Sequence, residues 1–341
     1  VRGMNGPAGF GRFVALDERD DPRLLERMSK HDLPVDGERY GVVSRLIARP
    51  GVSAVDLAAS VLRKLENESG SRMSEWGGLV LSSRMVDVEG AARGTAERLQ
   101  LQSPSLGVER ACSGFPAATE IAWGLCVERQ RPVAIATVEI VSDQINWEAA
   151  GGDLADQRRA RGQASKLFAD GAAAVLVMPG EAPGRHTILD AWVDEVPDEH
   201  QLIQKLDVEN AWDPWGKVRP GPTTCISMPG RRGFVLFKRA PRLMADAVER
   251  SLRRVNCPRT ALSHVVPHQA NGLIMEALEK ELAERSSPCR VWNCFRDCGN
   301  TVSASIPLAM AEVQDELPAG HLVAMPSVGA GGPGYRPDVL S

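Results

Sequence analysis

A cysteine at position 112 stands in the stretch VERACSGFP, between two charged residues and a turn of small residues. The segment AATEIAWGL that follows spaces its apolar residues as a helix does, so Cys112 directly precedes a predicted helix N-terminus. The positive end of a helix dipole stabilises a thiolate, which is the nucleophilic form of cysteine. Buried cysteines are otherwise common and inert, so a catalytic role for Cys112 requires partners elsewhere in the chain.

Two further residues carry groups that such chemistry can use. His268 lies in VVPHQAN, after an apolar strand-like run, and Asn300 lies in CGNTVSASIP, a glycine turn before a helix. Taken singly, a histidine is more often an ordinary satisfied imidazole, and an asparagine is more often a cap or turn residue. Together an imidazole and a carboxamide supply two neutral donors for an oxyanion, and the imidazole can also act as a base. Cys112, His268 and Asn300 are therefore the candidate catalytic residues.

The elements that must position these residues alternate between strand-like and helix-like runs. Apolar runs at 78–83, 132–141 and 168–178 predict strands, and helical spacing after ACSGF and over 271–285 predicts helices. Nearly continuous apolar strands separated by helices predict an α/β fold with buried, largely parallel strands and helices on both faces. The polar, Trp-containing segment at about 185–222 is predicted to be a loop or an irregular insertion.

The two halves of the chain repeat one pattern. Each half has a strand, a small-residue turn and an apolar helix, in ACSGFPAATEIAW and in CGNTVSASIPLAM. This repetition predicts a pseudo-duplicated fold with an N-terminal half at 1–180 that carries the cysteine and a C-terminal half at 181–341 that carries the histidine and the asparagine.

The composition is that of an ordinary globular protein and excludes several classes of partner. The 341 residues are 43% hydrophobic and 25% charged, with a formal net charge of −4, which leaves no basic footprint for nucleic acid. Apolar runs such as GAAAVLVM fall short of the roughly 20 residues that span a bilayer, and the N-terminal residues lack a signal-peptide pattern. We expect a cytoplasmic protein that binds neither nucleic acid nor membrane.

The seven cysteines are irregularly spaced and do not form a disulfide framework, so free thiols are expected. Cys289, Cys294 and Cys298 cluster, but without a C-x-x-C knuckle or a histidine at ligand spacing. We interpret these three as structural thiols and predict no metal site.

In order and context, these motifs resemble the type III β-ketoacyl-acyl-carrier-protein synthases, a family of the thiolase fold. The matching strings run in the family's order and cover residues 105–341: ACSGF, FADGAAAVLV, MPG with GFVLFKRAPRLMADAV, VVPHQAN, GNTVSASIPLAM and the glycine cluster GAGG at 329–332. The first hundred residues match only loosely.

The resemblance implies a five-layered αβαβα architecture of two similar halves, usually in a homodimer, with the catalytic residues at the junction of the halves. It implies that Cys112 accepts an acyl group from an acyl-carrier-protein or coenzyme A thioester, with no other cofactor. His268 and Asn300 would serve the second half-reaction, and the backbone N–H groups of Cys112 and Gly331 would form the oxyanion hole.

Several positions depart from the family's pattern. Glu109 and Arg110 stand ahead of the nucleophile, where small residues are usual, and would need partners or a water-lined pocket if they were buried. The family's aromatic and basic grip on the adenine nucleotide is not recognisable, although Tyr40 falls near its place. Pro333 interrupts the usual terminal glycine and aromatic pattern, which bears on the pocket floor.

A run of arginines suggests how the donor binds. Arg158, Arg159 and Arg161 lie where one family arginine helps to bind the nucleotide, and they could instead contact an acidic helix of a carrier protein or form a solvated charge run.

The departures point to polyketide or other specialised metabolism. They leave two acceptors open: a malonyl-type carbon, by decarboxylative condensation, and a hydroxyl or amine of a small natural-product intermediate. A non-catalytic scaffold subunit of a heterodimer is the alternative from another class. The presence of all three catalytic residues argues against the scaffold.

Overall fold

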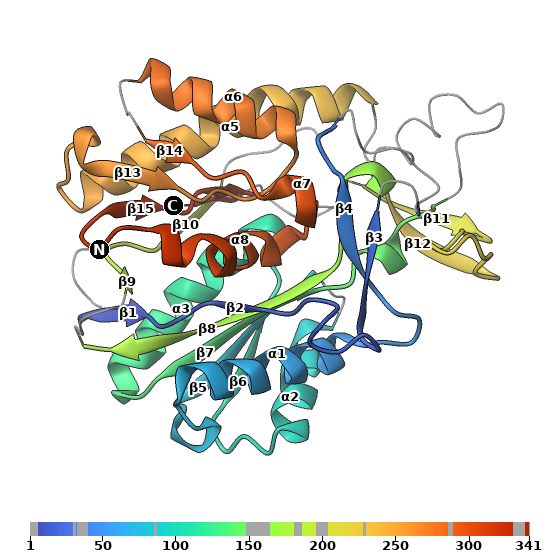
Figure 1. Cartoon of the computed structure of the whole chain (residues 1–341), viewed down its shortest axis with the longest axis horizontal. Helices are drawn as coiled ribbons and strands as arrows, with labels where there is room; N and C mark the ends of the chain where they lie inside the picture. The colour runs from blue at the N-terminus through green and yellow to red at the C-terminus, as the bar shows by residue number, and fades with distance from the viewer. Residues whose placement is uncertain are drawn as a thin grey trace.

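The chain forms alternating layers of helices and sheets (Figure 1). The computed structural model describes residues 6–29, 32, 40–84, 87–147, 164–180, 186–195, 204–227, 230–285, 289–329 and 338–340. None of the helices within these ranges is long and apolar enough to cross a bilayer. The cytoplasmic location stays a prediction.

The first sheet has the order β6-β5-β7-β8-β1-β9, and β2 (Val14–Ala15) pairs with β8. Its strands are β6 (Ser105–Val108), β5 (Gly78–Ser82), β7 (Val133–Glu139), β8 (Gly171–Pro179), β1 (Ala8–Phe10) and β9 (His186–Thr187). β5 runs parallel to β6 and β7, whereas β8 is antiparallel to β7 and β1. The expectation of largely parallel strands therefore holds for β6, β5 and β7 and is wrong for the rest of this sheet.

Both faces of the first sheet are covered by helices because its strands are apolar on both sides. Leu79 and Leu81 of β5 pack against α1 (Ala54–Ser69) and α2 (Val88–Arg98). Val80, between them, points to the opposite face and packs against α3 (Gly114–Arg129) and α8 (Ser305–Val313). Successive residues thus serve two different cores, as expected for a fully buried strand.

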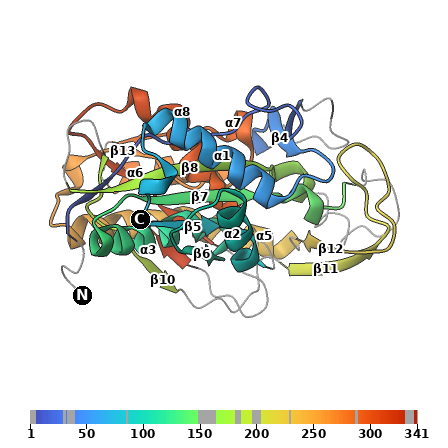
Figure 2. The ribbon, with the colours of Figure 1, turned by 90° about the horizontal axis from the view of Figure 1, so that it is seen from below.

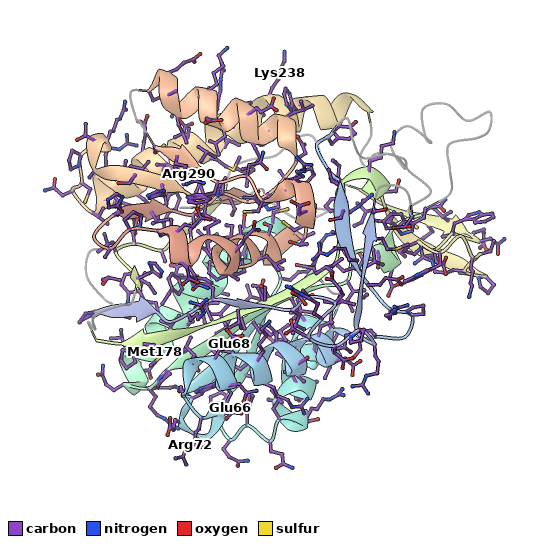
Figure 3. The ribbon with its side chains drawn as sticks, viewed as in Figure 1. Glu66, Glu68, Arg72, Met178, Lys238 and Arg290 are labelled. Atoms are coloured by element: carbon purple, nitrogen blue, oxygen red, sulfur yellow. The ribbon has the colours of Figure 1, made fainter. Side chains whose placement is uncertain are left out.

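The second sheet places β13 (Leu262–Val265) between the parallel strands β14 (Arg290–Val291) and β15 (Leu322–Ala324). Its outer face is covered by α5 (Gly230–Arg254) and α6 (Gly272–Glu284), whose Met244, Val248 and Leu278 share a core with Val265. The layers therefore run α1/α2, first sheet, α3/α8, second sheet, α5/α6, which confirms the five-layered α/β fold (Figure 1). Glu66 and Glu68 on α1 and Lys238 on α5 mark the two outer layers in Figure 3.

Shorter elements complete the described chain. β16 (Ser327–Val328), β17 (Asp338–Leu340) and β10 (Val193–Glu195) form a small antiparallel sheet, and α7 (Phe295–Cys298) ends just before Asn300. β3 (Leu25–Ser29) pairs with β4 (Ser44–Ala48).

The segment at 185–222 is more regular than the sequence indicated. It contains β9, β10 and β11 (Gln204–Glu209), and β11 pairs antiparallel with β12 (Pro222–Ser227). This two-stranded ribbon extends from one end of the molecule (Figure 2). Its polar composition obscured it, because the exposed Asp207, Glu209 and Thr224 lie among the buried Val208, Cys225 and Ile226. The boundary between halves at 180/181 stays a prediction.

Candidate active site

Cys112 lies in a strained turn at the head of a buried helix. The turn η3 (Ala111–Ser113) connects β6 to α3, and the cysteine side chain is buried. Ala111 has φ 43°, in the left-handed region that non-glycine residues rarely adopt. Such strain persists only where the surroundings enforce it and is common at active sites. The structure confirms that Cys112 immediately precedes a helix, as the sequence indicated.

A second turn of the same kind carries the C-terminal candidates. η6 (Val302–Ala304) follows Asn300 and leads into α8, and Val302 has φ 50°, an outlier for a β-branched residue. The two turns touch, since a Cβ placed on Gly114 would lie 2.8 Å from the Cβ of Ser303. The turn with Cys112 and the turn beside Asn300 therefore meet between the two sheets.

His268 follows β13 and is buried, with 3% of its surface exposed. Its backbone N–H donates to the carbonyl of Pro326 at 2.9 Å, and its Nδ1 lies 2.6 Å from Oγ of Ser305 at the start of α8. Burial lowers the pKa of His268 to about 4. The imidazole is therefore neutral at physiological pH, and the bond to Ser305 leaves Nε2 available to a substrate.

Asn300 is held on both sides of its carboxamide. Its Oδ1 accepts the N–H of Val302 at 3.0 Å, and its Nδ2 donates to the carbonyl of Ala270 at 3.2 Å. Its backbone carbonyl accepts the N–H of Ala169, which ties it to the first half of the chain. An amide nitrogen has two N–H donors, so the second N–H of Asn300 remains for a substrate oxygen. Ala270 lies two residues after His268, so this bond fixes the carboxamide of Asn300 relative to the backbone that carries His268.

Apolar side chains from both halves surround Cys112. Tyr40 packs against this cluster, and its place near the family's nucleotide-binding position stays a prediction. The buried members around Cys112 are Met28, Val42, Ile47, Ala111, Val141, Ile145, Trp147, Ala164, Leu167, Phe168, Ile226, Phe295 and Val302. A buried thiol in apolar surroundings, in a turn that contacts the turn after Asn300, suits the transfer of an acyl group through a thioester.

Comparison with known families identifies the family of this chain. The model of the 3-oxoacyl-[acyl-carrier-protein] synthase III family matches residues 106–194, and the model of the C-terminal part of the same family matches residues 252–333. Cys112 falls in the first match, and His268 and Asn300 fall in the second. The chain belongs to the 3-oxoacyl-[acyl-carrier-protein] synthase III family. It is accordingly an acyltransferase.

Relatives of this synthase III family cover most of the chain. The β-ketoacyl-[acyl-carrier-protein] synthase III of Rhodospirillum centenum is 29% identical over 95% of this chain and 94% of its own length. The enzyme of the same name from Oleidesulfovibrio alaskensis is 30% identical over 67% of this chain and 65% of its own length.

Solved structures of synthase III and related enzymes share the fold. The crystal structure of 3-oxoacyl-(acyl carrier protein) synthase III from Pseudomonas aeruginosa has a TM-score of 0.71 and 25% identity, and covers 98% of this chain and 97% of its own. Two further enzymes match at the level of the fold. The priming β-ketosynthase of a polyketide biosynthetic pathway has a TM-score of 0.74 and 22% identity, and the match covers 100% of this chain and 97% of that enzyme. A tetronic acid condensing enzyme has a TM-score of 0.73 and 18% identity, and the match covers 98% of both chains.

Other predicted positions meet different outcomes. Glu109 is exposed and Arg110 half-buried, because β6 ends at Val108, so Glu109 bears no burial cost. Arg158, Arg159, Arg161, Gly331 and Pro333 lie outside the described residues, and their roles stay predictions. Gly329, two positions before Gly331, lies beside the nucleophile turn, since a Cβ on it would be 3.0 Å from Oγ of Ser113.

The sequence analysis missed two polar residues at this site. Ser305 contacts the imidazole of His268, and Glu139 ends β7 as a buried carboxyl bonded to Ser303. A glutamate at the end of the apolar run PVAIATVEIV was the available signal, since a buried carboxyl requires partners.

Proposed function

We propose that this enzyme loads an acyl group from a carrier-protein or coenzyme A thioester onto Cys112 and passes it to a second substrate in polyketide or other specialised metabolism. The contact between the two strained turns carries the proposal, because it brings the turn that contains Cys112 against the turn that follows Asn300. The same turn leads to Ser305, which bonds His268.

In the first half-reaction, the thiolate of Cys112 attacks the carbonyl carbon of the donor thioester. A C–S bond to Cys112 forms, the C–S bond to the phosphopantetheine arm breaks, and the released thiolate takes a proton from solvent. We propose that the backbone N–H groups of Cys112 and Gly331 stabilise the oxyanion of the tetrahedral intermediate.

Decarboxylative condensation is the second half-reaction that the geometry supports best. Loss of CO2 from a malonyl thioester leaves an enolate, whose oxygen requires neutral donors. Nδ2 of Asn300 can supply one. Nε2 of His268 supplies the other in the tautomer in which Ser305 donates its hydroxyl to Nδ1, and the low pKa of His268 suits a donor better than a base. The enolate carbon then bonds to the acyl carbon, and the thiolate of Cys112 departs.

Transfer to a hydroxyl or amine is the second candidate, and one contact favours it. The hydroxyl of Ser305 donates to the carbonyl of Val302 at 3.0 Å, in which case Nδ1 of His268 carries the proton that Ser305 accepts. That tautomer leaves a lone pair on Nε2, which can take the proton of an alcohol or amine as the heteroatom attacks the acyl carbon.

Specialised metabolism is supported by how this chain departs from its family. Glu109 and Arg110 replace small residues ahead of the nucleophile, and Glu109 is open to solvent where an unusual partner can meet it. The same fold serves the polyketide priming ketosynthase and the tetronic acid condensing enzyme.

A homodimer is proposed from the edge of the first sheet. β6 ends the sheet order, with β5 as its neighbour within the described residues, and Leu106 at its centre is 37% exposed. An unpaired edge strand with an exposed apolar residue is suited to pairing with a second copy of itself.

Intact-mass measurement tests the proposed function. Wild-type protein incubated with a panel of acyl-CoA and acyl-carrier-protein thioesters should gain one acyl mass, and Cys112→Ala should gain none, because the thiol is the attachment point. A scaffold subunit would gain none in either form. Labelling that persists in the alanine variant would move the nucleophile to another of the seven cysteines.

The donor is tested with the same readout. We propose a carrier protein, because its acidic helix can meet Arg158, Arg159 and Arg161 and such steering weakens with salt. Arg158→Glu combined with Arg161→Glu should slow acylation from the carrier protein and spare acylation from the matching acyl-CoA. Equal rates from both donors, insensitive to salt and to the charge reversal, would point to coenzyme A.

A further inference from the structure

Glu139 is a carboxyl group that the catalytic steps above do not use, although it lies beside them. It is the last residue of β7, and only 2% of its surface is exposed. Residues alternate between faces along a strand, so Glu139 shares the face of Ile135, which packs in the central layer with α3 and α8. The carboxyl thus points toward the layer in which the two strained turns meet.

Three donors converge on this carboxyl. One oxygen accepts both the hydroxyl and the backbone N–H of Ser303, the latter at 3.3 Å, and the other accepts the backbone N–H of Arg84 at 3.1 Å. An ionised carboxylate can accept all three at once. Burial raises the pKa of Glu139 to about 7, although the bonds from Ser303 and Arg84 oppose the rise.

Ser303 is the middle residue of η6, so the bond reaches the catalytic groups on both sides of that turn. On one side, the N–H of Val302 donates to Oδ1 of Asn300. On the other side, Oγ of Ser305 lies 2.6 Å from Nδ1 of His268 and 3.0 Å from the carbonyl oxygen of Val302, so it links the imidazole to this turn. Val302 itself holds the strained φ of 50°, which needs external support.

The bond also crosses between the halves of the fold. Glu139 is in β7, in the half of the fold that carries Cys112. Ser303 lies 164 positions away, in η6 of the other half. It is therefore a tie that fixes the second turn relative to the sheet from which the Cys112 turn emerges.

We infer that Glu139 is a positioning residue for the second half-reaction: its carboxylate fixes η6 and thereby aims the carboxamide of Asn300 and the imidazole of His268 at the acyl group on Cys112. The inference rests on the proposed function. It predicts that loosening the tie harms transfer from Cys112 to the acceptor more than it harms loading of Cys112, because η3 does not depend on this bond.

The test compares the two half-reactions in three variants. Ser303→Ala removes the hydroxyl donor, Glu139→Gln keeps the shape and one acceptor oxygen, and Glu139→Ala removes the group. Acyl loading of Cys112 is followed by intact mass, and transfer is followed by loss of that mass and release of CO2 on addition of a malonyl thioester. We expect loading to stay within about threefold of wild type and transfer to fall by roughly 10–100-fold in both alanine variants, since small misplacements of catalytic groups have effects of this size. Glu139→Gln should recover part of the loss.

Thr95→Ala is the control. Thr95 is buried and donates its hydroxyl to the carbonyl of Ala91 at 2.8 Å, so this bond lies within α2 and does not reach η6. The control should lower the melting temperature without separating the two half-reactions. A merely structural role for Glu139 would give the same result, with loading and transfer reduced together, and would overturn the inference.

Hydrogen exchange supplies a readout that does not depend on the reaction. Backbone amides of 301–304 should exchange faster in Ser303→Ala and Glu139→Ala than in wild type, while those of 111–113 stay unchanged. Unchanged exchange over 301–304 would contradict the positioning role even if every variant were inactive. Failure of the wild-type protein to take up any acyl group would instead contradict the proposed function, and the exchange data would still decide on Glu139.

Discussion

At the scale of single residues, the site combines one thiol with donors that carry no charge. Asn300 cannot ionise, and burial lowers the pKa of His268 to about 4, so both remain neutral across the physiological range. Neutral donors can stabilise an oxyanion without first losing a charged partner. They also leave the ionisable carboxyl of Glu139 as the nearby group with a raised pKa.

Asn300→Ala should separate the two acceptors. In condensation the carboxamide donates to the enolate oxygen, and loss of one such donor typically lowers the rate by roughly 10²–10³-fold. Transfer to a heteroatom involves no enolate, so a smaller loss is expected there. The measurement is CO2 release from a malonyl thioester by the acylated enzyme. Wild-type protein that releases no CO2 would contradict condensation and favour the heteroatom acceptor.

Stability should depend on pH through Glu139. Its pKa is about 7 in the fold against a model value of 4.5, so between these values the folded chain binds more protons than the unfolded chain. The free energy of unfolding that Glu139 contributes therefore falls as pH rises from about 4.5 to 7, by up to about 3 kcal/mol. Glu139→Gln lacks this term.

Urea unfolding of both proteins at pH 5 and pH 8 measures the effect. The wild type should lose stability relative to Glu139→Gln between the two values. His268 has the opposite sign, since its lowered pKa removes stability as pH falls below 6.5, but it acts equally in both proteins and cancels. Parallel pH profiles would show that Glu139 has the same pKa in the folded and unfolded chains, and would contradict the raised pKa.

At the scale of elements, the two turns η3 and η6 determine the site, and their backbones meet closely. A Cβ on Gly114 would lie 2.8 Å from the Cβ of Ser303 and 2.1 Å from Oγ of Ser82. The serine hydroxyl can rotate away, but the Cβ of Ser303 moves only with η6. The two turns can therefore approach this closely because Gly114, the first residue of α3, has no side chain.

Gly114→Ala and Gly124→Ala test this point within one helix. Gly114→Ala should lower the free energy of unfolding by about 1–3 kcal/mol through overpacking and should slow transfer from Cys112 as η6 shifts. Gly124 has no atom within 4 Å of its ideal Cβ position, so Gly124→Ala should raise stability by about 0.5–1 kcal/mol as helix propensity improves. Equal effects of the two changes on denaturant unfolding would contradict the close contact.

What the sequence could predict at this scale follows from how local each signal is. ACSGF, VVPHQAN and GNTVSASIP each combine a turn with the start of a helix, so they located Cys112, His268 and Asn300. The tie between Glu139 and Ser303 joins positions 164 apart and leaves no local pattern. The antiparallel entry of β8 and β1 was missed because a strand buried on both faces reads the same in either direction. The β11–β12 ribbon was missed because exposed polar residues such as Asp207, Glu209 and Thr224 interrupt its buried apolar ones.

At the scale of the whole molecule, the candidate site lies between the two sheets, near the edge of the first sheet that β6 forms in the described part of the chain. β6 forms that edge and leads directly into η3. A second copy of the chain that paired with β6 would therefore lie close to the turn that contains Cys112.

Leu106→Lys should convert the proposed dimer into a monomer. A lysine on an edge strand disfavours strand pairing between copies, and Leu106 is the exposed apolar residue of β6. Sedimentation velocity of wild type, Leu106→Lys and the control Leu189→Lys checks this, since Leu189 is 50% exposed and lies outside the first sheet. A wild type that sediments as a monomer would contradict the dimer.

The contact between Gly114 and Ser303 also limits how this chain can change over evolutionary time. A larger residue at 114 fits only if the side chain at 303 becomes smaller or η6 moves away. A smaller residue at 303 lacks the hydroxyl that donates a hydrogen bond to Glu139. Substitutions in the two halves are therefore epistatic although the positions are far apart in the gene. We expect substitutions at 82, 114, 139 and 303 to occur together in related chains. The two halves have lost most of their sequence likeness, but at this contact they would still evolve as one unit.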